Sequence, residues 1–151
     1  MTDYPTDDNT MGARELAERT ARALYQQDSL SRAFDMKIEE IGPGRACLKM
    51  LVRPDMTNGH GTCHGGVLFA FADSAFAFAC NTYNARTVAA AASIEFLQAA
   101  RQDDELTAVA SEVWRSRRSG LYDVRILNQR KECIALFRGR SRQLDGKVID
   151  D

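Results

Sequence analysis

The chain has 151 residues, 44% of them hydrophobic, and its 20 lysines and arginines nearly balance 21 aspartates and glutamates. This length and apolar content suit one ordinary globular domain. The net charge of −1 gives no electrostatic basis for binding nucleic acid or a membrane. The four cysteines are scattered, without CxxC spacing or a dense disulfide framework. No apolar segment follows the first methionine as a secretory signal would require, so we expect a reduced, cytoplasmic protein.

The N-terminal part of the chain predicts a helix followed by a hairpin. The first ten residues are acidic and unpatterned, and we expect them to be mobile. Across residues 11–27, apolar or small residues recur at helical spacing opposite charged ones, which indicates a surface helix with one packing face. Residues 34–40 and 45–52 flank the turn signal Gly42-Pro43-Gly44, so we expect two short strands joined as a hairpin.

A glycine-rich loop, residues 58–66, leads into a nearly continuous apolar stretch that ends at about residue 84. Asp73 is the only carboxylate in that stretch, and its neighbours at helical spacing are apolar on both sides. Burying an unpaired carboxylate costs several kcal/mol unless the group is paired or used. The pattern therefore favours a functional role for Asp73 over the alternative of an exposed stripe on an amphipathic helix.

The start of the same helix is a second candidate for chemistry. A helix beginning at Gly65 or Gly66 presents unpaired N–H groups and the positive end of its dipole, which suit a phosphate, a carboxylate or a polarised carbonyl. The plainer alternative is a tight turn. At about 1.5 Å per residue, the eight residues from Gly65 to Asp73 span about 12 Å, so one carbonyl cannot contact both groups of one chain. If the two groups cooperate, Asp73 must come from a second copy, most simply across a two-fold axis.

Beyond residue 86 the pattern changes to extended segments with short connections. Alternation is clearest where Asp123 and Arg125 separate Tyr122, Val124 and Ile126. The predicted strands are residues 88–97, 105–116, 120–128 and 133–144. Four late strands predict an antiparallel sheet, which the long apolar helix needs to cover it on most sides. The predicted fold is therefore α+β: a curved antiparallel sheet wrapped around one long central helix, with an additional N-terminal helix.

Three motifs occur in order along the chain: Asn58 with His64-Gly65-Gly66 and Asp73, the run 91–97, and the ending 135–141. Over roughly residues 30–144 they resemble hotdog-fold acyl-CoA thioesterases, most closely the PaaI type of bacterial phenylacetate degradation. The resemblance implies a hotdog thioesterase domain at 30–144, after a tail and surface helix at 1–29 and before a polar tail at 145–151. It also implies a two-fold dimer with joined sheets that assembles into a homotetramer, and an acyl-CoA substrate with no separate cofactor and no metal.

The resemblance assigns catalytic roles to four residues. Asp73 of one subunit would act on a thioester bound to the partner's glycine turn, either as general base or as nucleophile, and both roles are chemically sensible. The N–H of Gly65 would polarise the thioester carbonyl. His64 and Asn58 would orient the carbonyl, the water or the loop.

Four further residues are candidates for substrate binding: Gly66, Ser93, Arg138 and Arg140. Ser93 could hold water near the expected site or could simply pack within its strand. Arg138 and Arg140 alternate on one face of the last strand, where they could bind the phosphates of coenzyme A or protect a solvated edge. Other arginines crowd the turn between two earlier strands: Arg115, Arg117 and Arg118.

Functions other than hydrolysis fit the sequence less well. Cys63 beside His64 could be a nucleophile and base, but sequence neighbours rarely adopt that geometry and no third orienting group is evident. His60, Cys63 and His64 could ligate a metal, yet no fourth ligand appears. A hotdog domain could also bind acyl-CoA without turnover or dehydrate an acyl thioester. Asp73 argues for hydrolysis, because a binder gains nothing from an unpaired carboxylate. We therefore expect hydrolysis. The resemblance alone implies the acyl group, so that the expected substrate is an aryl-acyl-CoA, phenylacetyl-CoA or a ring-hydroxylated relative, cleaved to the free acid and coenzyme A.

Overall fold

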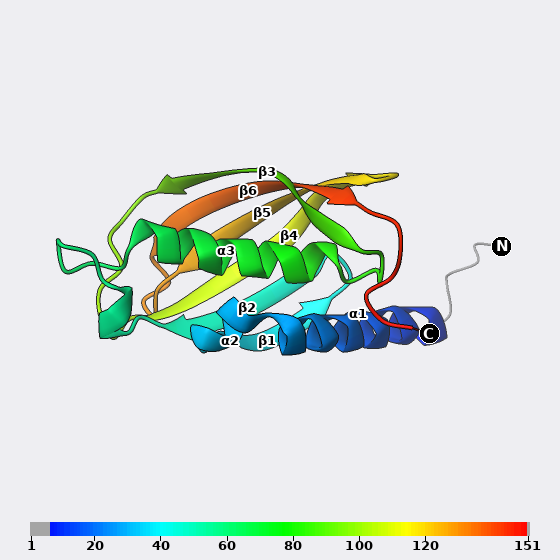
Figure 1. Cartoon of the computed structure of the whole chain (residues 1–151), viewed down its shortest axis with the longest axis horizontal. Helices are drawn as coiled ribbons and strands as arrows, with labels where there is room; N and C mark the ends of the chain where they lie inside the picture. The colour runs from blue at the N-terminus through cyan, green and yellow to red at the C-terminus, as the bar shows by residue number, and fades with distance from the viewer. Residues whose placement is uncertain (1–6, 151) are drawn as a thin grey trace.

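One curved sheet of six strands forms the body of the computed structural model, which describes residues 7–150 and their side chains from residue 12 onward (Figure 1). The strands are β1 (Lys37–Gly42), β2 (Arg45–Leu51), β3 (Thr87–Phe96), β4 (Glu105–Ser116), β5 (Ser119–Leu127) and β6 (Cys133–Gln143). They lie in the order β1-β2-β4-β5-β6-β3, and every neighbouring pair is antiparallel. The two edges of the sheet are therefore β1 and β3.

Three α-helices accompany the sheet within the described residues: α1 (Asp7–Gln27), α2 (Ser29–Ala33) and α3 (Gly65–Cys80). A short 3-10 turn, Pro54–Met56, precedes the loop that leads into α3. Figure 1 shows α3 lying lengthwise against one face of the curved sheet, with α1 beside β1 and β3 at the opposite edge. None of the described helices is long and apolar enough to span a membrane.

The core lies between α3 and the sheet. Phe71, Phe76 and Phe78 of α3 are at most 1% exposed, and the ring of Phe76 packs edge-on against Tyr122 with centroids 5.6 Å apart. Gly139 of β6 makes room for this packing, since a Cβ there would lie 2.9 Å from the ring of Phe76. A helix that is apolar nearly all round is stable only inside such a layer. The sheet therefore fixes the position of α3 and of everything α3 carries.

The predicted fold is confirmed, with differences at the ends of elements. The N-terminal helix begins at Asp7, so the expectation of a mobile segment is wrong for residues 7–10, while residues 1–6 lie outside the described part of the chain. Residues 29–33, which lie between the predicted helix and the predicted hairpin, form α2, and β1 begins only at Lys37 instead of at residue 34.

The central helix ends at Cys80, earlier than the apolar run suggested, because the next residue turns the chain. The side-chain amide of Asn81 donates to the carbonyls of Ala77 and Thr87, at 2.8 and 2.9 Å, and its Oδ1 accepts from the N–H of Thr87 at 2.9 Å. Asn81 thereby closes α3 and ties its end to the first residue of β3.

The edge strand β3 is exposed along most of its length. Val88 is 43% exposed and Phe96 is 54% exposed, and the alanines 89–92 between them are exposed as well. A long apolar edge strand presents unpaired backbone groups to any chain that can pair with it. This edge is poorly suited to remain in water.

Candidate active site

The loop before α3 is ordered by the side chain of Asn58. Its Oδ1 accepts hydrogen bonds from the N–H groups of His60 and Thr62, at 2.9 and 3.2 Å, and from the Thr62 hydroxyl at 3.3 Å. The N–H of Asn58 in turn donates to the Thr62 carbonyl at 2.8 Å, which closes the loop. Such side-chain to backbone bonds fix a local turn. Orienting the loop is one of the roles the sequence allowed for Asn58.

His64 caps the N-terminus of α3. Its backbone is extended, and its Nδ1 accepts a hydrogen bond from the N–H of Gly66 at 2.9 Å. The N–H groups of Val67 and Leu68 donate to the carbonyl of His64. Among the described residues, no acceptor faces the N–H of Gly65. One donor of the first turn is therefore left free, at the positive end of the helix dipole.

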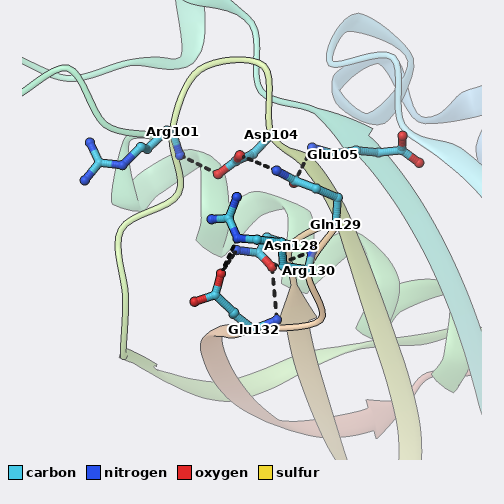
Figure 2. A network of polar contacts seen from close by, with 7 residues as sticks. All are labelled: Arg101, Asp104, Glu105, Asn128, Gln129, Arg130 and Glu132. Atoms are coloured by element: carbon cyan, nitrogen blue, oxygen red, sulfur yellow. Dashed lines mark hydrogen bonds and ion pairs between the residues drawn. The ribbon is translucent and has the colours of Figure 1, made fainter.

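A polar network holds the turn to which this loop is bonded (Figure 2). The two carboxylate oxygens of Asp104 accept from the N–H of Arg101, at 2.8 Å, and from Nε2 of Gln129, at 2.9 Å. These bonds hold the turn that follows Ala100, whose carbonyl accepts from the N–H of Cys63 at 2.7 Å. The residue that precedes His64 is thus anchored to a rigid turn, which limits movement of the helix start.

Asp73 lies in the middle of α3 and opens into a groove of about 580 Å³, here the Asp73 groove, between α3, the α1–α2 junction and the first residues of β3. The carboxylate is half-buried and forms no hydrogen bond or ion pair with any described residue. Burial raises the pKa of Asp73, and the nearby negative charge of Asp28 adds to the effect. An unpartnered carboxylate in such a setting is a stronger base than one in water.

A second pocket, of about 330 Å³, lies at the N-terminal end of α3 and is lined by Asn58, Gly65 and Phe96, among others. This Gly65 pocket shares no lining residue with the Asp73 groove. Eight helical residues, or about 12 Å, separate the two groups. The structure thus keeps the free N–H and the free carboxylate apart within one chain.

Known proteins with a similar sequence and fold identify the family. Residues 60–135 match the model of the thioesterase superfamily. Over 135 residues the chain is 40% identical to the acyl-coenzyme A thioesterase PaaI of Escherichia coli, which covers 89% of this chain and 96% of that protein. The chain belongs to the thioesterase superfamily.

Solved structures of similar proteins show the same fold. The structure of E. coli PaaI, from the phenylacetic acid degradation operon, matches with a TM-score of 0.88 at 39% identity, over 89% of this chain and 98% of that one. A mutant of the phenylacetic acid degradation protein PaaI from Thermus thermophilus gives 0.75 at 36% identity, over 78% and 100%. A hypothetical thioesterase from Streptococcus pneumoniae, solved with coenzyme A, gives 0.72 at 25% identity, over 74% and 90%. The chain is accordingly a thioester hydrolase with the hotdog fold.

Three residues predicted to bind substrate in this thioesterase lie away from both the Gly65 pocket and the Asp73 groove. Ser93 and Arg138 are paired across β3 and β6 and line a separate hollow of about 450 Å³ on the face of the sheet turned away from α3. Arg138 forms a two-point ion pair with Asp123, at 2.6 and 2.9 Å. Arg140 is exposed, two residues further along β6. The geometry of one chain gives their predicted binding roles no support, whereas Gly66 stays at the helix start as the partner of the His64 cap.

The alternative of a cysteine nucleophile in this thioesterase also finds no support. Cys63 is buried, and burial, with a smaller effect of Asp104, raises the pKa of its thiol to about 11. A thiol with that pKa stays protonated at neutral pH and is a poor nucleophile. Within the described part of the chain, no group of three or more His, Cys, Asp or Glu side chains is placed to hold a metal ion.

Sequence reasoning missed two residues that shape the Gly65 pocket and the Asp73 groove. Phe96 covers the helix start, where a Cβ on Gly65 would lie 3.1 Å from its ring. Asp28 lines the Asp73 groove and caps α2. The capping preference of aspartate before a short helix could have indicated Asp28. No local pattern predicts the contact of Phe96, because it joins segments far apart in the chain.

Replacing Asp73 by asparagine is expected to raise the melting temperature near neutral pH. The pKa of Asp73 is raised by folding, so above that pKa its ionised form destabilises the folded state. The rise in melting temperature should disappear as the pH falls below the ordinary carboxyl pKa, where Asp73 is protonated in both the folded and the unfolded state. Thermal melts of wild type and Asp73→Asn across pH check this, with Asp55→Asn as the control for an exposed aspartate paired to an arginine. A lower melting temperature for Asp73→Asn at neutral pH would show that the carboxylate has a stabilising partner.

Proposed function

We propose that the protein is an acyl-CoA thioesterase with a site shared between two subunits. Gly65 of one subunit polarises the thioester carbonyl, and Asp73 of the other activates the attack on it. One observation carries this proposal: an N–H and a carboxylate, neither of which has a partner among the described residues, lie on one helix in two separate pockets. Each is half of a hydrolytic site, and a second copy of the chain can complete both.

Antiparallel pairing of β3 with β3 of a second copy would join the half-sites. The first residues of β3, Thr87 to Ala89, line the Asp73 groove, and its last residue, Phe96, lines the Gly65 pocket. A two-fold axis through the middle of β3 places the start of one strand beside the end of the other. The Gly65 pocket of one copy then meets the Asp73 groove of its partner. The exposed apolar edge of β3 supports this pairing.

The proposed chemistry needs only groups that this site supplies. The thioester oxygen accepts a hydrogen bond from the N–H of Gly65, while the His64 cap and the Asn58 turn hold that donor in place. Asp73 takes a proton from a water molecule whose oxygen bonds to the carbonyl carbon. In the other route, the carboxylate itself attacks and forms an anhydride that water opens. In both routes the carbon–sulfur bond breaks, and coenzyme A leaves as a thiolate that takes up a proton.

We propose an aryl-acyl substrate, phenylacetyl-CoA or a ring-hydroxylated relative. The Asp73 groove is lined by apolar side chains that suit such a group, including Leu24, Phe76 and Phe78. The likeness to two proteins named for phenylacetic acid degradation supports the same acyl class. The likeness to a thioesterase solved with coenzyme A supports coenzyme A as the group that carries the acyl chain. Coenzyme A enters as part of the substrate, and the proposed reaction uses no separate cofactor.

The proposed assembly is a homodimer that pairs into a homotetramer in the cytoplasm. The family resemblance supports the tetramer, and β3 supports the dimer. The cysteines support a reducing compartment, since all four are free and Cys63 and Cys80 are buried.

Asp73→Ala and Asp73→Asn are both expected to lower the rate of phenylacetyl-CoA hydrolysis by at least about a hundredfold, because each removes the base or nucleophile. Thiol release, followed with a chromogenic disulfide over phenylacetyl-, hydroxyphenylacetyl-, benzoyl- and straight-chain acyl-CoA, measures the effect and ranks the acyl groups. Unchanged circular dichroism and size would show that the variants are folded. Turnover retained in both variants would remove Asp73 from the mechanism. Binding without release by wild type would instead indicate an acyl-CoA binding protein.

Gly65→Pro is expected to lower kcat by about a hundredfold or more, because it removes the N–H that polarises the carbonyl. Proline is favoured at the first position of a helix, and His64, at φ −60° and ψ 134°, already has the extended backbone that a residue before proline needs. Gly65→Ala is the matched control, since it keeps the N–H and adds a similar contact with Phe96. Equal losses in the two variants would assign the effect to that contact instead of the N–H.

A further inference from the structure

We propose that Asp28 is a positioning residue for Asp73: held at the α1–α2 junction, its carboxylate places a second negative charge on the wall of the Asp73 groove and tunes Asp73 as a base. The inference rests on the proposed role of Asp73 in hydrolysis.

The carboxylate of Asp28 is fixed by two hydrogen bonds to one residue. Its Oδ1 accepts from the N–H of Ser31 at 2.9 Å, as the N-cap of α2, and its Oδ2 accepts from the Ser31 hydroxyl at 2.6 Å. The charge therefore has a defined position at the end of α1. A long, flexible surface side chain would not fix a charge in this way.

The same contacts continue to the central helix. Ser31 is fully buried, and its Oγ lies 2.9 Å from Oγ of Ser74. Because the Ser31 hydroxyl donates to Asp28, it accepts from the hydroxyl of Ser74, which follows Asp73 on α3. A chain of three side chains thus ties the Asp28 carboxylate to the turn of helix that carries Asp73.

Among the described residues, no other charged side chain that lines the groove offsets the negative charge of Asp28. Among the described residues that line it, Asp28 and Asp73 are the only charged side chains. The other titratable group is the thiol of Cys80, whose pKa is raised to about 12, chiefly by burial, so that it is neutral. The start of β3 contributes Thr87, Val88 and Ala89, which carry no charge. In the proposed dimer, His64 of the second copy would also face the groove.

A fixed negative charge opposes ionisation of a neighbouring carboxyl. Burial is the larger cause of the raised pKa of Asp73, and Asp28 is the second. A carboxylate that holds its proton more strongly removes a proton from water more readily. Asparagine or serine would cap α2 as well as aspartate does. The charge of Asp28 is therefore more than the cap alone requires.

Asp28→Asn tests the proposal, because it removes the charge and keeps an oxygen that can cap α2. The dependence of kcat/KM on pH should keep its shape, with its acidic limb shifted to lower pH, since Asp73 then ionises at lower pH. The plateau rate should fall, because Asp73 becomes a weaker base. Titration of the Asp73 carboxyl carbon by NMR, in the same variant, should show the same downward shift without reference to turnover.

Two controls separate charge from structure. Asp55→Asn removes a charge that lies in another turn and pairs with Arg53, so its acidic limb should coincide with that of wild type. Ser31→Ala removes the hydroxyl that joins Asp28 to Ser74 of α3, while the charge of Asp28 remains. It should lower the melting temperature and shift the acidic limb less than Asp28→Asn does.

Either of two results would overturn the proposal. One is an acidic limb and an Asp73 titration in Asp28→Asn that coincide with wild type. The other is an equal shift in Asp55→Asn. Failure of the proposed function would look different: wild type would then release no thiol from any acyl-CoA, while the NMR titration of Asp73 in Asp28→Asn would still report on the charge.

Discussion

The burial of α3 against the curved sheet is the constraint on which the rest of the structure depends. A helix this apolar is stable only where the sheet covers it, with α1 alongside, and that place determines where its two candidate catalytic groups can go. The N–H of Gly65 points out at one end of the helix, and the carboxylate of Asp73 opens to a groove near its middle. Because the helix is rigid, no movement within one chain brings the two together. In the proposed mechanism, the need for a second copy therefore follows from the packing of a single helix.

Two features of the proposed site destabilise the single folded chain, and other parts of the fold offset them. A half-buried carboxylate without a partner disfavours the folded state at neutral pH, and an exposed apolar edge strand disfavours the single chain in water. The large apolar layer under α3 outweighs the first cost, and pairing of β3 would remove the second. The loop at the helix start is held by Asn58 on one side and by the Asp104 turn on the other. The free donor of Gly65 is thus fixed before any substrate arrives.

Local patterns in the sequence predicted much of this. The apolar run with one carboxylate indicated α3 and Asp73, and the alternation around Tyr122 indicated the sheet, because these signals depend on neighbours at fixed spacing. The spacing from Gly65 to Asp73 alone predicted that the two groups lie apart.

Other features depend on contacts between distant segments, and these the sequence could not show. The face on which Ser93 lies is set by its pairing with Arg138, and the register is shifted between Ala89 and Ala91, so counting along the strand did not reveal it. The contact of Phe96 with Gly65, and the approach of Asp28 to the groove of Asp73, likewise arise only when the layers pack.

Mixing two inactive variants tests the shared site most directly. Asp73→Asn and Gly65→Pro chains are dissociated together, allowed to reassociate, and assayed for thiol release from phenylacetyl-CoA. A mixed dimer has one site with both residues intact and one with both replaced. Random pairing therefore predicts recovery of about a quarter of wild-type activity. If each chain formed its own site, every site would carry one defect, and the mixture would be as inactive as its two components.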